Sequence, residues 1–331
     1  MFLRAAENVR AGRAASEIAS RIAVSSSSML RDLLSLTKPR VISLLLVTTI
    51  APMFATERRL PSWSLVMVVA VAGYLMAGGA NAINMWFDRD IDGRMVRTKR
   101  RPVPTGRIAA PVALAFGLAL GAIAFWLFWQ LVNPLSAWLA LGGLVWYVLV
   151  YTMWLKRSSP RNIVIGGAAG AFPALVGWAA VTGHLDLTAI YLFAIIFFWT
   201  PPHFWALALI KQRDYANVGV PMFPVVRGEQ RTRFEMLIYT LMLFPLTLMP
   251  VAFGAFGWFY GISAAVLDAI LLWYCLRLWT PAVMPRAWKM YRYSLLYLFL
   301  LFLAMPIDRY VAPVRTRGPS DTITIVEALG R

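Results

Sequence analysis

The chain has 331 residues, 60% of them hydrophobic and only 14% charged, whereas a soluble domain carries roughly 25% charged residues. This composition excludes an ordinary soluble protein and predicts a polytopic membrane protein. The formal net charge of +17 would also suit a nucleic-acid-binding protein, but the positions of the basic residues indicate a role in membrane topology.

Nine apolar stretches follow one another along the chain, and most reach the roughly 20 residues with which a helix crosses a bilayer. A helix satisfies its own backbone hydrogen bonds and can therefore span lipid. The sequence thus predicts an all-α bundle of about nine transmembrane helices. A start of the first helix near Leu33 would place Lys38 and Pro39 in its opening turns. The nine stretches are 41–56, 63–85, 108–129, 135–155, 162–182, 187–210, 234–253, 258–280 and 291–307.

The basic residues alternate between the two sides of this predicted bundle. Before the first span and in every second connection lie 26 Lys and Arg, whereas the other connections and the C-terminal tail carry six. Because cytoplasmic segments are enriched in Lys and Arg, the N-terminus is expected in the cytoplasm and the C-terminus across the membrane. A bacterial inner membrane is the first choice of location, and a mitochondrial inner membrane the second.

Three segments are expected: a basic, flexible N-terminal arm at 1–32, one intramembrane domain at 33–307, and a C-terminal tail at 308–331. The arm is rich in Ala, Ser and Arg, but its acidic residues favour a plain cytoplasmic arm over a cleaved targeting segment. The lone Cys275 excludes an intrachain disulfide framework. Function is expected in the bundle and in its cytoplasmic loops, where a central cavity opens to the cytoplasmic side.

A run of amides and carboxylates ends the second predicted span, with Asn81, Asn84, Asp88 and Asp92 as its most informative residues. At roughly 100° per residue these four positions fall on one face of a helix, whereas Asp90 faces away and is expected to be solvated or to support the others. Converging oxygens of this kind suit a hard cation. Basic residues follow at Arg94, Arg97, Lys99, Arg100 and Arg101. Together they predict a magnesium ion that carries a phosphorylated ligand.

A second polar segment, 211–224, follows the sixth predicted span on the same side of the membrane, so its Asp214 is expected level with the first motif. Three spans lie between the second and the sixth, which is compatible with two halves of a bundle that face each other across one cavity. Other interpretations stay open, because Lys211 and Arg213 are also typical anchors of a helix end, and any single polar side chain here is often only solvated.

The sixth predicted span contains Pro201-Pro202-His203. Two consecutive prolines remove backbone donors and tend to kink a helix, which membranes tolerate beside a cavity or a neighbouring helix. If the helix resumes, His203 and Asp214 lie about three turns apart on one face, with His203 deeper in the cavity. A lone membrane histidine is often only a packing residue, and the other histidine, His184, is expected in a short connection on the far side.

Four separated motifs carry a resemblance to a known family. They are Asn84-x3-Asp88-x3-Asp92, Arg97-Thr98-Lys99-Arg100-Arg101-Pro102, Pro202-His203-Phe204 and Asp214-Tyr215-x3-Gly219-x-Pro221-Met222, and the opening segment Thr37-Lys38-Pro39-Arg40-Val41 is similar as well. The chain resembles the protoheme IX farnesyltransferases, or haem O synthases, within the intramembrane prenyltransferase superfamily. The likeness covers most of residues 35–305.

The resemblance implies an enzyme that transfers the farnesyl group of farnesyl diphosphate to a vinyl group of haem B (protohaem IX), which yields haem O and releases diphosphate. Mg²⁺ is the implied cofactor, and haem B is a substrate. The implied metal ligands are Asn84, Asp88, Asp92 and Asp214. The implied catalytic residues are these four with Arg97 and Arg101, and the implied substrate-binding residues are Lys38, Arg40, Asn81, Lys99, His203, Lys211 and Tyr215.

Several roles stay open within this resemblance. His203 would either ligate the haem iron or hydrogen-bond a propionate, and the sequence does not divide the basic residues between diphosphate and propionates. Aromatic residues near the motifs would face a carbocation or the porphyrin, or would only pack; they are Trp86, Phe197, Phe198, Trp199, Phe204 and Trp205. The expected partners are farnesyl diphosphate, haem B, the lipid bilayer, and a haem O-modifying enzyme or terminal oxidase assembly, without nucleic acid.

Two alternatives remain. A prenyltransferase acting on an aromatic acid or a quinone precursor would share the magnesium and diphosphate apparatus, but such relatives typically carry a second Asp at the position of Val218. A non-enzymatic transporter would also place polar residues inside the membrane. A transport pathway needs such groups towards both sides, however, and here they cluster at one.

Overall fold

The computed structural model describes residues 28–56, 60–280 and 283–311, and within these residues it contains helices, turns and loops but no strand. The longer helices are Ser28–Thr37, α2 (Pro39–Ala55), α3 (Trp63–Phe87), α5 (Ala110–Leu131), α6 (Pro134–Val145), α9 (Ala168–Thr182), α10 (Leu187–Ile210), α12 (Phe223–Ala252), α13 (Trp258–Leu276) and α14 (Val283–Val311). The shorter ones are α4 (Arg89–Asp92), α7 (Lys156–Ser158), α8 (Asn162–Gly166), α11 (Gln212–Ala216), the π-helix η1 (Trp146–Leu155) and the 3-10 helix η2 (Arg277–Trp279).

Among the described residues, eight helical segments are long and apolar enough to cross a membrane. The bent pair formed by Ser28–Thr37 and α2 makes a ninth span if it is counted as one. Some spans combine neighbouring elements, because α6, η1 and α7 form one continuous segment, and α8 and α9 form another. The predicted all-α bundle of about nine membrane helices is confirmed.

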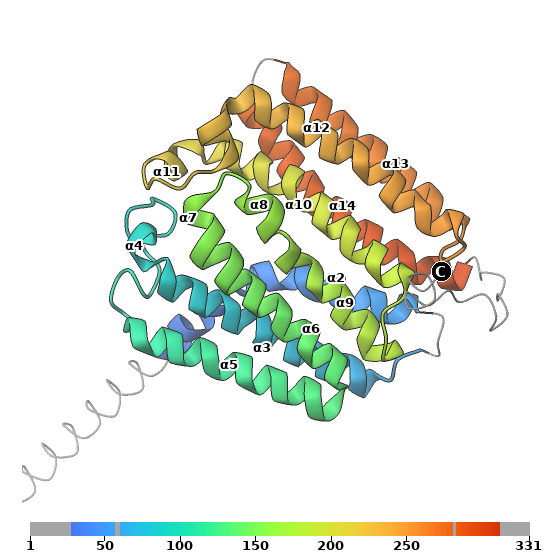
Figure 1. Cartoon of the computed structure of the whole chain (residues 1–331), viewed down its shortest axis with the longest axis horizontal. Coiled ribbons are helices and arrows are strands. Elements are labelled where there is room, and N and C mark those ends of the chain that lie inside the picture. Colours follow the sequence, from blue (N-terminus) through green and yellow to red (C-terminus); the bar gives the residue numbers. More distant parts are fainter. Residues whose placement is uncertain (1–27, 57–59, 281–282, 312–331) are drawn as a thin grey trace, which may run out of the picture.

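The spans pack in chain order around a ring. Each contacts the next, from α2 through α3, α5, α6, α9, α10, α12 and α13 to α14, and α14 contacts α2 again. Further contacts join α2 to α9 and α10 to α14 (Figure 1). The first and second halves of the chain therefore face each other, as the spacing of the two polar segments predicts.

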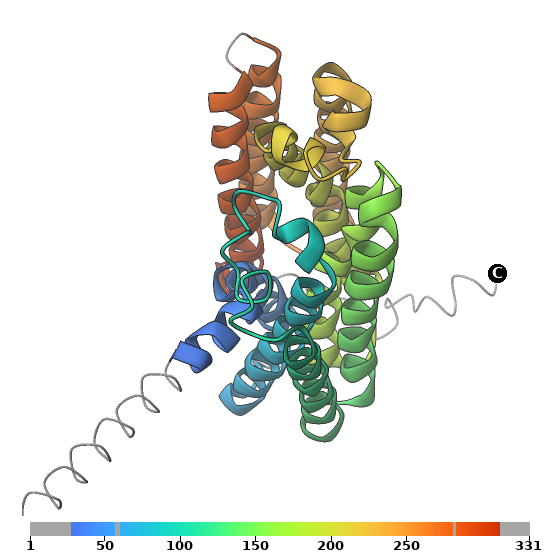
Figure 2. The ribbon, with the colours of Figure 1, turned by 90° about the vertical axis from the view of Figure 1, so that its left-hand side faces the viewer.

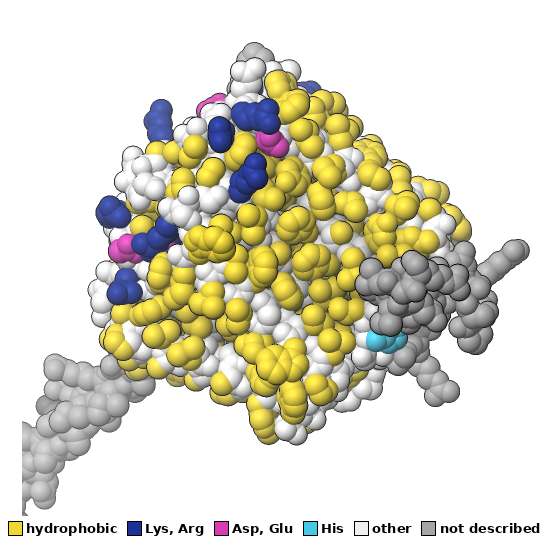
Figure 3. All heavy atoms as spheres, in the orientation of Figure 1, with side chains coloured by type: hydrophobic (Ala, Val, Ile, Leu, Met, Phe, Trp, Pro, Cys, Tyr) yellow, Lys and Arg dark blue, Asp and Glu magenta, His cyan; other side chains and the backbone are white. Residues whose placement is uncertain are grey.

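Both polar segments lie at one end of the ring. In Figure 1, α4, α7 and α11 share the left-hand edge, and Figure 2 shows α4 and α11 in front of the ring when that edge faces the viewer. Figure 3 shows the charged side chains of the visible face gathered towards the same edge, with hydrophobic surface over the rest. The predicted clustering of polar groups at one end is thus present in the structure.

The first span is broken at Lys38, whose φ of 56° and ψ of 62° are left-handed. The following proline, Pro39, disfavours the right-handed helical conformation at Lys38. The helices on the two sides of this break differ in direction by 45°. The helical chain therefore begins before Leu33, and Lys38 lies at a break in the first span rather than in its opening turns.

Two spans extend beyond their predicted bounds. α12 begins well before the predicted 234 and bends at Gly228, whose φ of 77° is readily adopted only by glycine. α14 extends past both ends of the predicted 291–307. These extensions contain charged residues, so a search for apolar stretches does not include them. Residues 28–32 of the predicted arm and 308–311 of the predicted tail are helical, and the rest of both segments lies outside the described residues.

Glycines set the distance between several helices. A Cβ atom on Gly79 of α3 would lie 2.6 Å from the carbonyl oxygen of Gly117 in α5. A Cβ atom on Gly177 of α9 would lie 1.7 Å from the carbonyl oxygen of Thr49 in α2. Neither position has room for a side chain, so the close approach of α2 and α9 depends on Gly177.

Replacing Gly177 by alanine tests this contact. Gly177→Ala is expected to lower the melting temperature of the purified protein in detergent, because overpacking typically costs about 1–3 kcal/mol. Gly170→Ala is the matched control, since it lies in the same helix and its Cβ would meet no heavy atom within 4 Å. Tryptophan fluorescence during heating measures both variants, and an unchanged melting temperature for Gly177→Ala would contradict the described packing.

Candidate active site

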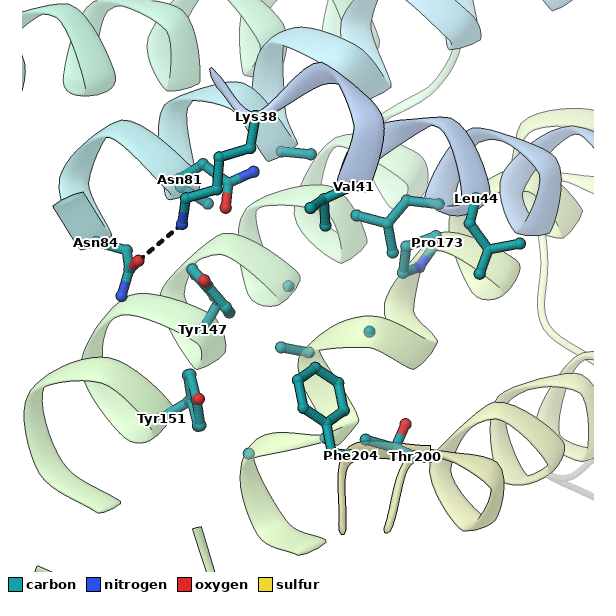
Figure 4. A pocket seen from close by; sticks show the side chains of 18 of the residues that line it. Lys38, Val41, Leu44, Asn81, Asn84, Tyr147, Tyr151, Pro173, Thr200 and Phe204 are labelled. Carbon is teal, nitrogen blue, oxygen red and sulfur yellow. Dashed lines mark hydrogen bonds between the residues drawn. The ribbon is translucent and has the colours of Figure 1, made fainter. Parts of the chain in front are cut away.

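A cavity of about 630 Å³ lies inside the ring of spans. Its lining includes residues of α2, α3 and the loop around α4 in the first part of the chain, and of η1, α9, α10, α11 and α14 in the rest. Figure 4 shows Lys38 and Asn84 close together at one end, with the rings of Tyr147 and Tyr151 nearby. Apolar side chains line the remaining wall, so the cavity has a polar end and an apolar body.

Asn84 connects three elements at the polar end. Its Oδ1 accepts a hydrogen bond from Lys38 Nζ at 3.0 Å (Figure 4). Its Nδ2 donates to Asp88 Oδ2 at 2.7 Å and to Thr152 Oγ1 of η1 at 3.1 Å. An ammonium group only donates and a carboxylate only accepts, so Lys38 and Asp88 together determine which way the amide points.

The two buried carboxylates of the first motif are each paired with a base. Asp88 and Asp92 are only 1% and 3% exposed. Lys156 Nζ bonds Asp88 Oδ2, and Arg101 Nη1 lies 2.6 Å from Asp92 Oδ2. The backbone amides of both aspartates still donate to carbonyls four residues earlier, so helical spacing persists beyond the end of α3. Asp92 lines the cavity, whereas Asp88 reaches it only through its partners Asn84 and Lys156.

Asp90 is directed away from this group, as predicted. Its carboxylate lies 2.7 Å from the guanidinium of Arg157, and 53% of its side chain is exposed. The hydrogen bond from Arg157 lowers the pKa of Asp90 to about 2. Asp90 thus ties the segment after α3 to the end of the fourth span, and it does not line the cavity.

Arg97 joins the two polar segments. Its Nη2 donates to the hydroxyl of Tyr215 at 3.0 Å, and its guanidinium carbon lies 5.3 Å from the centre of the Tyr215 ring. Both residues line the cavity. The structure therefore brings the loop after α4 and the helix α11 together, in agreement with the topology predicted from the spans.

The second segment contributes Tyr215 to the cavity, but not Asp214. α10 ends at Ile210, and Lys211 leaves the helical conformation with φ −107° and ψ 18°. Asp214 follows on the separate helix α11, where it is half-buried and outside the lining. The continuous helix expected to align His203 with Asp214 is therefore not present.

Most of the predicted site residues meet at this cavity. The lining includes Lys38, Arg40, Asn81, Asn84, Asp92, Arg97, Arg101, His203 and Tyr215. The predicted residues outside the lining are Asp88, Asp214, Lys99 and Lys211. Lys99 is exposed on the loop after α4, which explains why its charge does not reach the cavity. Of the basic residues on this loop, Arg97 and Arg101 line the cavity.

His203 is buried in the cavity wall between aromatic rings. Its ring stacks on Trp199 at 4.3 Å and on Tyr291 at 4.8 Å between centroids. Its Nδ1 lies 2.7 Å from Ser294 Oγ of α14. The α10 helix continues through both prolines, so the Pro-Pro pair does not interrupt it. His203 thus links α10 to α14.

The fourth span supplies four site residues that sequence reasoning misses. These are Tyr147, Tyr151, Thr152 and Lys156, all in or directly after η1. The tyrosine rings lie 5.5 Å apart and line the cavity with Lys156. A π-helix bonds residues five apart, so the α-helical period does not predict which of its side chains share a face. Lys156 is the one residue of this group that the sequence could have indicated, because it is a basic residue directly after an apolar stretch, on the same side of the membrane as the two polar segments.

The donor chemistry of the first motif fits a hard cation. Asn84, Asp88 and Asp92 present amide and carboxylate oxygens within two turns of chain, which is the ligand type that Mg²⁺ prefers. Within the described part of the chain, no three His, Cys, Asp or Glu side chains gather closely enough to hold a metal by themselves. Mg²⁺ commonly takes only one or two carboxylates and completes its shell with water and substrate phosphates, so a set of two carboxylates and an amide is of the kind that it uses.

Comparison with known proteins identifies the family. Residues 44–304 match the UbiA prenyltransferase family. The chain belongs to the UbiA prenyltransferase family. The protoheme IX farnesyltransferase of Deinococcus radiodurans is 53% identical over 293 residues, which cover 85% of this chain and 94% of that protein. The protoheme IX farnesyltransferase of Roseiflexus sp. (strain RS-1) is 56% identical over 284 residues, which cover 86% of this chain.

This UbiA chain spans about half the length of several relatives, since the match covers 53% of the Roseiflexus protein. A UbiA homologue from Archaeoglobus fulgidus, solved with GPP and Mg²⁺, matches the structure with a TM-score of 0.59 at 17% identity. The match covers 83% of this chain and 99% of that one. The two proteins therefore share a fold.

Lys156 offers a direct test of the polar end. Lys156→Met is expected to weaken binding of Mg²⁺-diphosphate about 10-fold or more, because a hydrogen bond to a charged group is worth about 1.5–3 kcal/mol. Isothermal titration of the purified protein with inorganic diphosphate measures the affinity. Lys289→Met is the control, because Lys289 is an exposed lysine of α14 outside the cavity lining. Equal affinities in both variants would exclude Lys156 from the anion site.

Proposed function

We propose that this UbiA chain transfers the farnesyl group of farnesyl diphosphate to a vinyl group of haem B, forming haem O and releasing diphosphate. The observation that carries the proposal is a single cavity in which a cationic, amide-bearing end adjoins an apolar and aromatic body. Relatives named protoheme IX farnesyltransferase support the choice of substrates. Val218 supports it further, because prenyltransferases of aromatic acids typically carry an Asp at that position.

The cationic end suits the diphosphate group. Lys38, Arg101 and Lys156 all line it, and each is held by a partner from another part of the site. Breaking the allylic carbon–oxygen bond leaves negative charge on the diphosphate oxygen. Donors fixed beforehand around that oxygen stabilise the charge as it develops, without reorganising during the reaction.

Asn84, Asp88 and Asp92 would hold Mg²⁺ beside these bases. When bound, Mg²⁺ neutralises the phosphate oxygens and so makes diphosphate a better leaving group. The hydrogen bonds of Asp88 with Asn84 and Lys156 keep its carboxylate in place. Asp214 remains a predicted fourth ligand. It lies on α11 next to Tyr215, which lines the cavity, but it is outside the lining itself.

The apolar body suits the farnesyl chain and its carbocation. Leu44, Phe128 and Pro173 are among the side chains that exclude water from it, and a dry pocket prevents hydrolysis of the cation. Tyr147 and Tyr151 line the cavity on the η1 side near its polar end, where the carbon–oxygen bond would break. Their rings offer negative π faces to a cation.

The wall formed by α10 and α14 suits the porphyrin. Trp199, His203 and Tyr291 form a continuous stack there, and Phe204 lies beside it. A vinyl carbon held against the allylic carbon forms the new carbon–carbon bond, and addition of water to the resulting cation, with loss of one proton, gives the hydroxyethylfarnesyl group. The chain's part in this step is to position the two reactants.

We place the protein in a bacterial inner membrane, with its N-terminus and the polar end of the cavity on the cytoplasmic side. The distribution of Lys and Arg supports this orientation, and the bacterial relatives support the location. Haem O would then pass to a haem O-modifying enzyme or to a terminal oxidase assembly.

Product identification tests the proposal. Membranes that contain the protein are expected to convert farnesyl diphosphate and haem B into haem O, detected by mass. Asp92→Asn should lower this turnover about 100-fold or more, as expected for a charge that supports the leaving group. Asp90→Asn, which changes an exposed carboxylate, is the matched control and should retain turnover. Prenylated 4-hydroxybenzoate without haem O, or substrate movement without diphosphate release, would contradict the proposal.

Metal removal gives a separate test. Chelation of divalent cations is expected to stop diphosphate release, and added Mg²⁺ should restore it, because Asn84, Asp88 and Asp92 offer only oxygen ligands. Asp214→Asn should raise the Mg²⁺ concentration needed for half of the maximal rate if Asp214 is the fourth ligand. Diphosphate release that continues at full rate after chelation would remove the metal from the mechanism.

A further inference from the structure

The hydrogen bonds around His203 determine its tautomer. Ser294 has one hydroxyl proton, and its Oγ donates that proton to the carbonyl oxygen of Tyr291 at 2.8 Å. With that proton engaged, we assign the 2.7 Å contact between Ser294 Oγ and His203 Nδ1 as a hydrogen bond donated by the histidine. This assignment puts the ring proton on Nδ1 and leaves a lone pair on Nε2.

The ring of His203 is held firmly enough for this lone pair to have a fixed direction. Trp199 and Tyr291 stack on it with interplanar angles of 16° and 24°. Trp199 is itself anchored, because its Nε1 donates to the backbone oxygen of Ser294 at 2.9 Å. Ser294 thus fixes both the histidine and one of the rings that cover it, and it is only 1% exposed.

Nε2 of His203 is available to a ligand in the cavity. The side chain lines the cavity, and its one hydrogen bond within the described residues engages Nδ1. A lone pair accepts protons or binds metals, and it cannot donate to a carboxylate. This tautomer therefore does not suit a hydrogen bond to a propionate, which was one of the two roles open from the sequence. A metal ion with a free axial position suits it directly.

We propose that His203 coordinates the iron of the porphyrin acceptor through Nε2, and that Ser294 is a positioning residue which holds the required tautomer. The inference rests on the proposed function, since it takes haem B as the acceptor. One coordinate bond to a rigid imidazole fixes the distance of the porphyrin from α10. It thereby limits the positions that the vinyl group adopts towards the polar end, where the farnesyl cation forms.

The test compares porphyrins with and without iron. Purified full-length protein titrated with haem B is expected to show the absorption and electron paramagnetic resonance spectrum of histidine-ligated haem. His203→Gly should lose that spectrum and regain it when imidazole is added. Ser294→Ala should weaken haem B binding about 10-fold, as changes behind a metal ligand commonly do, and should alter the spectrum. Metal-free protoporphyrin IX should bind the wild type and both variants equally.

His184→Ala is the matched control, because His184 is the other histidine and is exposed at a turn outside the cavity lining. It should leave the haem spectrum unchanged. An unchanged spectrum in His203→Gly would overturn the inference, as would an equal loss of metal-free porphyrin binding in Ser294→Ala. If His203→Gly fails to fold, the wild type is measured instead. Hyperfine coupling between the haem iron and a histidine nitrogen in its electron paramagnetic resonance spectrum would support the inference, and its absence would overturn it. Wild-type protein that makes no haem O would instead overturn the proposed function.

Discussion

The amide of Asn84 is the interaction on which the polar end of the cavity depends. It joins the break before α2 through Lys38, the end of α3 through Asp88, and η1 through Thr152. Buried charges are costly unless they are paired and hydrogen-bonded, and this amide supplies bonds to both signs of charge at once. Three segments that are distant in sequence therefore share one buried polar group.

Two departures from regular α-helix lie at the cavity. Lys38 has left-handed backbone angles, and η1 is a π-helix. Both segments contribute lining residues. Irregular backbone at membrane depth is tolerated where protein or a cavity, rather than lipid, surrounds it, so its concentration here agrees with a site of function.

Different interactions hold the two parts of the cavity wall in place. Around the polar end, carboxylates and bases form ion pairs, so the charges there are held in place. At the wall made by α10 and α14, Trp199 and Tyr291 stack on the ring of His203. Close helix contacts through Gly79 and Gly177 hold these ends in one enclosure.

Hydrophobic length and charge asymmetry predict the membrane bundle and the gathering of polar groups at one end, and helical spacing predicts the common face of Asn84, Asp88 and Asp92, because these are local properties. The family resemblance adds Arg97 and His203 as candidates, and both line the cavity. Packing between distant segments brings Lys156 rather than Lys99 to the cavity and leaves Asp214 outside its lining. Those outcomes depend on a π-helix and on the path of loops, which are set by packing between distant segments and leave no periodic signal in the chain.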